Sequence, residues 1–212
     1  RKYPKTVRVV EEMIRFYNDN PTLRKVLAIA DTPFETREEL GCMMCDAFMA
    51  ETGSEIAVEN PGGVRIDALS QGDIAVRDVL EMDPFDNHAV VLELTGDEIV
   101  RMMLSYCHNT LHSFPYVGGM TCEITLEKDF PEKIKSVNLF TLDGKKLNMK
   151  KKYKVVTNNY IPATSEIPEG SAHTLNLETS DIIMQYLEKK GTVSYQGRSR
   201  SEERRVGKEC RS

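Results

Sequence analysis

An asparagine, two glycines and an arginine stand close together in the run Asn60-Pro61-Gly62-Gly63-Val64-Arg65, directly after a segment typical of a strand. Glycine lets backbone N–H groups approach a ligand and tolerates positive φ, and arginine presents a rigid fork of donors to phosphate or carboxylate. The run is therefore a candidate anion-binding turn. It is also compatible with an ordinary Pro-Gly-Gly turn that precedes a solvated arginine.

Residues that bind metals or act as nucleophiles show no such grouping. The histidines are scattered, and no Gly-Asn-His-Glu or His-x-His run is present, although a dimetal phosphatase centre needs several such ligands together. Cys42 and Cys45 fall in a helical pattern, and the other cysteines are isolated. Buried thiols in a Met-rich helix are therefore favoured over a zinc site. We predict no metal site and no catalytic residue in this chain.

The composition is that of a globular, acidic chain. It has 212 residues, 40% of them hydrophobic and 29% charged, with a formal net charge of −5. A chain of this length has room for one large domain, and its negative charge makes it a poor general binder of nucleic acid. No apolar run is long enough to predict a membrane span.

The two ends of the chain differ from the middle. The chain begins Arg1-Lys2 without an initiator methionine, so we expect residues 1–24 to be a helix leading in from a missing or separate upstream region. Residues 200–212 read like a sequencing adapter translated in one frame, and we interpret them as a non-native tail. The predicted domain therefore covers residues 25–199.

The apolar periodicity predicts a mixture of helices and strands. Helices are expected at residues 6–18, 38–51, 78–81, 97–107 and 180–190, and strands at 25–30, 55–58, 89–94, 120–126, 134–140, 152–157 and 192–195. We expect Gly53 to end the second helix and Asp143-Gly144 to form a hairpin turn after residue 140. Because strands and helices do not alternate regularly, the predicted fold class is α+β.

Several short motifs then occur in a fixed order. They are Asn60-x-Gly-Gly-Val-Arg65, Gly72-Asp-Ile74, Asp78-Val-Leu80, Pro84-Phe85-x-Asn87, Leu94-Thr-Gly96, Val117-Gly-Gly119 and Tyr153-Lys-Val-Val-Thr-Asn158. In this order they resemble the C-terminal domain of the 5'-nucleotidase family, which includes UDP-sugar hydrolases and 2',3'-cyclic-nucleotide phosphodiesterases. The resemblance covers roughly residues 25–197. It implies a layered α/β/β/α sandwich with mixed sheets.

The resemblance also implies a division of labour. Members of the family join this domain to an N-terminal metallophosphatase domain that carries two divalent metal ions, and they act in the periplasm or outside the cell. We expect this chain to bind a nucleotide or nucleoside and to need a metallophosphatase domain, in cis or as a separate chain, for hydrolysis. By itself it should not hydrolyse phosphate esters. The alternative is a non-catalytic module that binds a nucleoside or small ligand, or docks to a partner.

Each site residue is implied by its match to the family's motifs. In the first turn, which includes Gly62 and Gly63, Asn60 matches an asparagine that faces the nucleoside, and Arg65 matches a phosphate-binding arginine. The remaining matches are Phe85 to the first of two rings that stack on the base, Asn87 to a contact with the base edge, Gly118 or Gly119 to a backbone contact beside the base, Tyr160 to the second ring, and Glu166 to an aspartate that binds the ribose hydroxyls.

The chain departs from the family pattern at three places. Asn159-Tyr160-Ile-Pro-Ala-Thr-Ser-Glu166 lacks the two glycines usual in that loop, and Pro61 replaces a glycine in the first motif. A further phosphate-binding arginine, expected just before Phe34, is Pro33, while Arg37 is out of register. The phosphate grip would then rest on Arg65 alone, or the ligand would carry less charge.

Overall fold

The structure, a computed structural model, describes residues 3–110, 114–127 and 134–206. Its helices are α1 Pro4–Asn18, α2 Arg37–Thr52, the short 3-10 helix η1 Pro61–Gly63, α3 Val76–Met82, α4 Gly96–Asn109, α5 Tyr160–Thr164 and α6 Thr179–Lys190. Its strands are β1 Val26–Ala30, β2 Ile56–Glu59, β3 Gly72–Ala75, β4 His88–Thr95, β5 Tyr116–Gly118, β6 Met120–Glu127, β7 Ile134–Thr141, β8 Lys152–Asn158, β9 Ala172–Glu178, β10 Thr192–Val193 and β11 Ser201–Val206. The predicted α+β class is confirmed.

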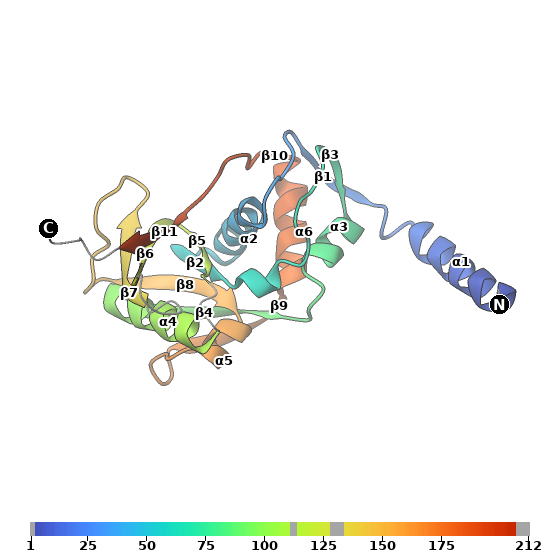
Figure 1. The fold of residues 1–212 in the computed structure, drawn as a ribbon. Coiled ribbons are helices and arrows are strands. Elements are labelled where there is room, and N and C mark those ends of the chain that lie inside the picture. The colour runs from blue at the N-terminus through green and yellow to red at the C-terminus, as the bar shows by residue number, and fades with distance from the viewer. Residues whose placement is uncertain (1–2, 111–113, 128–133, 207–212) are drawn as a thin grey trace, which may run out of the picture.

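The strands form three mixed sheets (Figure 1). The central sheet has the order β5-β2-β8-β4-β9, and two smaller sheets have the orders β10-β1-β3 and β11-β6-β7. In the central sheet β2 and β8 are parallel, whereas the pairs β2–β5, β4–β8 and β4–β9 are antiparallel. The parallel pair brings the carboxyl ends of β2 and β8 to the same edge of the sheet, beside the turns that follow them.

Two apolar cores lie on opposite faces of the central sheet. One joins α2, α3 and α6 to the small sheet β10-β1-β3 and to Ala57, Ala89 and Val156 of the central sheet. The other joins α4 and strands β6 and β7 to the opposite face, through residues such as Ile56 and Val155. Adjacent residues of β2 and β8 thus alternate between the two cores, as the two-residue period of a strand requires.

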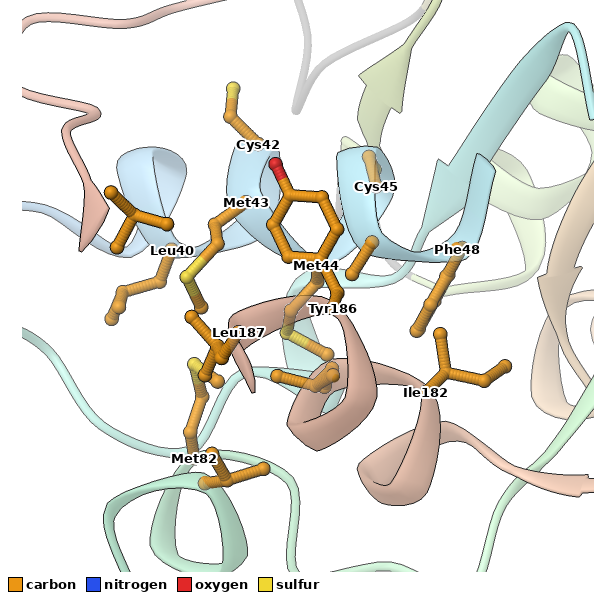
Figure 2. Packing of buried hydrophobic residues seen from close by; sticks show 14 of the residues in the cluster. Leu40, Cys42, Met43, Met44, Cys45, Phe48, Met82, Ile182, Tyr186 and Leu187 are labelled. Atoms are coloured by element: carbon orange, nitrogen blue, oxygen red, sulfur yellow. The ribbon is translucent and has the colours of Figure 1, made fainter. Parts of the chain in front are cut away.

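Helix α2 is buried along most of its length, and Figure 2 shows Met43 and Met44 on the side that lies against Tyr186 and Leu187 of α6, whereas Cys42 points away from α6. The stripe predicted for this helix is confirmed, since Leu40, Met43, Met44, Ala47 and Phe48 are all fully or almost fully buried. Thr36 and Glu39 form a capping box at its start. Gly53, with φ 61°, ends it as predicted.

Helix α4, on the other face of the central sheet, also begins with a capping box and buries one side. Thr95 caps it, with Glu98 completing the capping box. The residues predicted to face inward, Ile99, Met102, Met103 and Tyr106, are buried. At the other end of α4, Asn109 Nδ2 donates to the Thr164 carbonyl at 2.9 Å, which holds the end of this helix beside α5.

The turn after β7 forms as predicted, but the strand that follows it does not pair with β7. Gly144 has φ 80°, and the Thr141 amide donates to the Lys145 carbonyl across the turn. Beyond it, only an isolated bridge between Phe140 and Lys146 continues the hairpin. Strand β8 instead pairs with β2 and β4 in the central sheet. The Asp143-Gly144 pair therefore predicted the turn correctly. It did not indicate that the next strand, β8, pairs with strands far away in the sequence.

The terminal segments lie outside the two cores. Helix α1 projects from the rest of the chain in Figure 1, and its apolar side chains Val7, Met13 and Ile14 are each more than half exposed. At the other end, β11 runs parallel to β6, and Arg200 forms two hydrogen bonds with Asp46, of 2.6 and 3.0 Å. The division into residues 1–24, 25–199 and a non-native tail stays a prediction.

Candidate functional site

A pocket of about 380 Å³ lies where the carboxyl ends of β2 and β8 meet the end of α4. Four separate segments of the chain form its walls. Its lining residues are Asn60, Gly62, Gly63, Arg65, Phe85, Asn87, Tyr106, Thr110 and Tyr160. The structure thus brings together seven of the ten site residues predicted from the sequence, although they span a hundred positions of the chain.

The first wall is the turn that follows β2. Pro61 starts the 3-10 helix η1, where its fixed φ fits and its missing N–H is not needed, and the Gly63 amide donates to the Asn60 carbonyl at 2.9 Å. Neither Gly62 nor Gly63 has positive φ. Gly63 is needed for space instead, because a Cβ there would lie 2.2 Å from Glu59 Oε1.

Arg65 supplies the positive charge of the pocket. Its backbone amide donates to the Met82 carbonyl at 2.8 Å, which fixes the turn, and its side chain is exposed. The guanidinium carbon lies 5.7 Å from the centre of the Phe85 ring. Within the described residues the guanidinium forms no ion pair with a carboxylate, so its donors are available to an anion. Arg37, in contrast, pairs with Asp67 at 2.6 Å and does not line this pocket.

Two aromatic side chains face the pocket with much of their surface exposed. Phe85 is 39% exposed and Tyr160 is 44% exposed, which is unusual for rings of this size in a domain whose other aromatic residues are mostly buried. Phe85 and Asn87 lie on the loop between α3 and β4, where Asn87 accepts a hydrogen bond from the Thr179 amide through its carbonyl at 2.8 Å. Flat apolar surfaces beside one cation suit a ligand with a ring and an anionic group.

A buried acid, Asp83, holds the Phe85 loop. Its Oδ2 accepts a hydrogen bond from the Thr179 hydroxyl at 2.6 Å, and the Phe85 amide also bonds to it. Burial raises the pKa of Asp83 to about 6, and these two hydrogen bonds oppose the rise. The loop that carries Phe85 is therefore anchored by a buried carboxyl whose pKa is raised to about 6.

A second buried acid, Glu59, lies beneath the first turn. Its side chain is almost fully buried, and burial raises its pKa well above its usual range, with the nearby Asp83 carboxylate adding to the effect. Oε1 accepts a hydrogen bond from Asn158 Nδ2 at 2.9 Å, whereas Oε2 has no partner among the described residues. An ionised carboxylate would be poorly compensated there, so burial favours the neutral form of Glu59.

We expect the free energy of unfolding to fall as pH rises from about 4 to beyond 6 through these two acids. Their pKa values are higher in the folded state, so the unfolded chain releases its protons first and gains stability relative to the fold. Glu59→Gln should therefore be more stable than the original chain at pH 8, by about 1–2 kcal/mol, and this gain should disappear at pH 4. Guanidinium denaturation at pH 4, 6 and 8 measures it.

The matched control for this prediction is Glu169→Gln, because Glu169 is exposed on the loop before β9. It should change the free energy of unfolding by less than about 0.5 kcal/mol at every pH. A stability difference for Glu59→Gln that is the same at pH 4 and pH 8 would contradict the assignment of a neutral acid.

The structure does not bring Gly118 and Gly119 to the pocket. They join β5 to β6 against α2, where a Cβ on Gly118 would lie 2.9 Å from Cys45 Cβ and one on Gly119 would lie 2.0 Å from the Glu55 carbonyl oxygen. Close approach of backbone and side chains explains both glycines without a ligand. Their assignment as a base contact stays a prediction that this geometry does not support.

Glu166 also lies elsewhere. Its amide donates to the Ser105 hydroxyl at 2.7 Å, and its side chain lines a different cavity with Glu98, Arg101, Ile167 and Pro168. The segment before it forms α5, which replaces the glycine-containing loop of the family pattern. The residues that follow Tyr160 are thereby carried away from the pocket, since a helical turn advances the chain along its own axis.

Two lining residues were not predicted. The apolar pattern marked Tyr106 only as a core residue of α4, and Thr110, which follows that helix, carried no sequence signal. The Thr110 hydroxyl donates to the Tyr106 carbonyl at 2.7 Å, capping the end of α4. Both reach the pocket because α4 ends above the turn after β8, a relation that no local pattern encodes.

The thiols and metal-binding side chains add nothing to this site. Cys42, Cys45, Cys107 and Cys122 are free and buried, which confirms the prediction of buried thiols for the first two. Burial raises the pKa of Cys42 to about 11. In the described ranges, no three His, Cys, Asp or Glu side chains are placed to hold a metal ion, and no helix is long and apolar enough to cross a bilayer.

The fold resembles that of a known nucleotidase. A solved 5'-nucleotidase precursor from Thermus thermophilus superposes with a TM-score of 0.74 and 25% identity, over 92% of this chain and 42% of that one. The family described as 5'-nucleotidase, C-terminal domain, matches residues 23–166. The chain belongs to this family, as the order of its motifs predicted.

Curated relatives agree with this assignment. The trifunctional nucleotide phosphoesterase protein YfkN of Bacillus subtilis is 32% identical over 58% of this chain and 9% of its own length. The cell wall protein Lmo0130 of Listeria monocytogenes is 30% identical over 60% of this chain and 18% of its own length. The chain therefore spans less than a fifth of either relative.

Proposed function

We propose that this chain is the nucleotide-recognition domain of a 5'-nucleotidase-type phosphoester hydrolase in nucleotide catabolism. Arg65 receives the phosphate, and the rings of Phe85 and Tyr160 receive the base. Asn60 and Asn87 offer amide groups to the nucleoside, and the turn at Gly62 and Gly63 lets the ligand approach the backbone. A metallophosphatase domain, in cis or as a separate chain, carries two divalent metal ions and performs the hydrolysis.

The observation that carries this proposal is the convergence of one unpaired cation and two exposed rings on one pocket. Arg65, Phe85 and Tyr160 come from three separate segments, and all three line the same cavity of about 380 Å³. Stacking on aromatic rings tolerates different bases, whereas a planar guanidinium selects a phosphate or carboxylate. The pairing matches the chemistry of a nucleotide better than that of a purely apolar ligand.

We also propose a cellular location for the protein, from the description of one relative. One relative is described as a cell wall protein, and this supports action in the periplasm or at the cell surface. The rival proposal is a binding module without an associated hydrolase. The displacement of Glu166 from the pocket favours it in one respect, because a predicted ribose contact is then missing.

Titration calorimetry with AMP, adenosine and UDP-glucose tests the proposal. We expect AMP to bind with micromolar affinity, and Phe85→Ala and Tyr160→Ala each to weaken it by about 5-fold to 150-fold, since stacking is worth about 1–3 kcal/mol per base. Each variant removes one flat surface from the base. The same loss should appear for adenosine, because the stacking does not involve the phosphate.

Leu142→Ala is the matched control, since Leu142 is an apolar side chain that is 65% exposed on the turn after β7 and does not line the pocket. It should leave all three affinities unchanged. Failure of the original chain to bind any of the three ligands would sink the proposal. Binding of adenosine as tight as that of AMP would favour the nucleoside-binding module instead.

A further inference from the structure

Glu59 and Asn158 end two neighbouring strands at the same level. Strands β2 and β8 are parallel, with Ile56 opposite Val155 and Ala57 opposite Val156, so the last residue of β2 lies beside the last residue of β8. Both side chains are only 1% exposed. A hydrogen bond of 2.9 Å from Asn158 Nδ2 to Glu59 Oε1 joins them directly beneath the pocket.

The side-chain amide of Asn158 has a hydrogen-bond partner for each of its donors and acceptor sites. Nδ2 donates to Glu59 Oε1 at 2.9 Å and to Asn60 Oδ1 at 2.6 Å. Oδ1 accepts hydrogen bonds from the backbone amides of Tyr160 at 3.0 Å and Ile161 at 3.2 Å. Two donors and two acceptor sites are all that an asparagine side chain has, so its orientation is fixed.

The partners of Asn158 belong to two opposite walls of the pocket. Asn60 lies in the first turn, and Gly63 of the same turn packs so closely on Glu59 that a Cβ would collide with Oε1. Tyr160 begins α5 on the other wall. Asn158 itself does not line the pocket. Its hydrogen bonds join Glu59 and Asn60 on one side to Tyr160 and Ile161 on the other.

The amide of Asn60 fits in two orientations, and the link between Asn158 and the first turn survives in both through Glu59. In one, its oxygen accepts from Asn158. After a rotation of 180°, its nitrogen donates to Glu59 Oε1 at 3.1 Å and its oxygen accepts from the Gly63 amide at 2.8 Å. In this second orientation the Asn60 nitrogen faces the Asn158 nitrogen, so Glu59 and the Gly63 amide hold the Asn60 side chain, and Asn158 acts on the turn through Glu59.

We propose that Asn158 is a positioning residue, which sets the separation of the Asn60 turn from the Tyr160 ring and so the shape of the nucleotide pocket. The register of β2 and β8 fixes where Asn158 lies, and the hydrogen bonds of its side chain then fix the distance between the Asn60 turn and Tyr160. The ligand is the AMP of the proposed function, on which this inference rests for the identity of its probe.

Asn158→Asp separates the two halves of the network. The new carboxylate still accepts from the Tyr160 and Ile161 amides, but at pH 8 it lacks both N–H donors of Asn158. The contact with Glu59 then survives only in reverse, with the neutral Glu59 donating, and the bond to Asn60 Oδ1 is lost. We expect AMP affinity to fall at least about tenfold at pH 8 and by less than about threefold at pH 5.5, where a protonated carboxyl can donate again. Calorimetry of the full chain at both pH values measures this.

Affinities are compared with the original chain at the same pH, because other groups titrate nearby. The groups that act on Glu59 or respond to it are Asp83, Cys45 on α2 and Tyr116 on β5. Thr157→Val is the matched control. Thr157 precedes Asn158 on the same strand, is fully buried, and its hydroxyl has no partner among the described residues. It should bind AMP within twofold of the original chain.

Asn158→Ser covers the case in which Asn158→Asp does not fold at pH 8. A serine hydroxyl can still cap the Tyr160 amide, is neutral, and is too short to reach Glu59. Its AMP affinity should fall about tenfold at both pH values. A loss of less than twofold for either folded variant at pH 8, or an equal loss for Asn158→Asp at both pH values, would overturn the proposal.

A measurement without ligand keeps the positioning role separate from the proposed function. The chain contains no tryptophan, so Tyr160→Trp introduces a single fluorescent reporter. Adding Asn158→Asp to this variant at pH 8 should raise its acrylamide quenching constant at least about twofold, and adding Thr157→Val should not. Equal quenching in both would reject positioning. Absence of AMP binding to the original chain would reject the proposed function alone.

Discussion

Arg65→Ala is expected to weaken AMP binding by about 10-fold to 150-fold, because charge-assisted hydrogen bonds to a phosphate contribute about 1.5–3 kcal/mol. Adenosine, which has no phosphate, should lose less than about threefold, from the contact between the guanidinium and the Phe85 ring. Calorimetry with both ligands measures the two losses. Arg65→Lys should recover only part of the AMP affinity, since an ammonium keeps the charge but not the planar fork.

The control for charge is Arg101→Ala. Arg101 is an exposed arginine on α4 that lines the separate cavity containing Glu166, so its loss changes the net charge equally. It should leave AMP affinity within twofold. The pair of variants also decides between two pockets: if Arg101→Ala weakened AMP binding and Arg65→Ala did not, the nucleotide would lie beside Glu166, and the site described above would be wrong.

Gly119→Ala is expected to destabilise the domain by about 3–5 kcal/mol, a large share of the 5–15 kcal/mol typical of a folded domain. Gly119 has φ 72°, where an alanine is strained by about 1–2 kcal/mol, and its Cβ would lie 2.0 Å from the Glu55 carbonyl oxygen. That oxygen belongs to the backbone just before β2, so relief would require the strand to move. The midpoint of guanidinium denaturation measures the loss.

Gly144→Ala isolates the contribution of the clash. Gly144 has a similar positive φ, 80°, but a Cβ there would meet nothing within 4 Å. It should lose only the conformational strain, about 1–2 kcal/mol. Equal losses in the two variants would show that backbone conformation, and not close packing, accounts for Gly119. A larger loss for Gly119→Ala agrees with a structural role for the Gly118-Gly119 pair.

The local parts of the fold were predictable because their causes are local. Thr36 and Gly53 bound α2 through hydrogen bonds within a few residues, and the apolar stripes of α2 and α4 follow the helical period. The hairpin turn at Gly144 was likewise predicted, whereas the pairing of β8 with β2 and β4 was not. Strand pairing depends on partners far away in the sequence, and the alternation of residues along a strand does not identify them.

The sequence by itself determined the family, the α+β class and the chemical types at the site: a glycine turn, a cation and two rings. The tertiary structure decided which of these meet. Arg65, Phe85 and Tyr160 share a pocket, Glu166 and Gly119 lie elsewhere, and Tyr106 and Thr110 join from the end of α4. The hydrogen bond between Glu59 and Asn158 beneath the pocket could not be predicted from the sequence either, since it follows from the parallel register of two strands about a hundred residues apart. A motif specifies the chemistry a residue can perform, and only packing places it beside its partners.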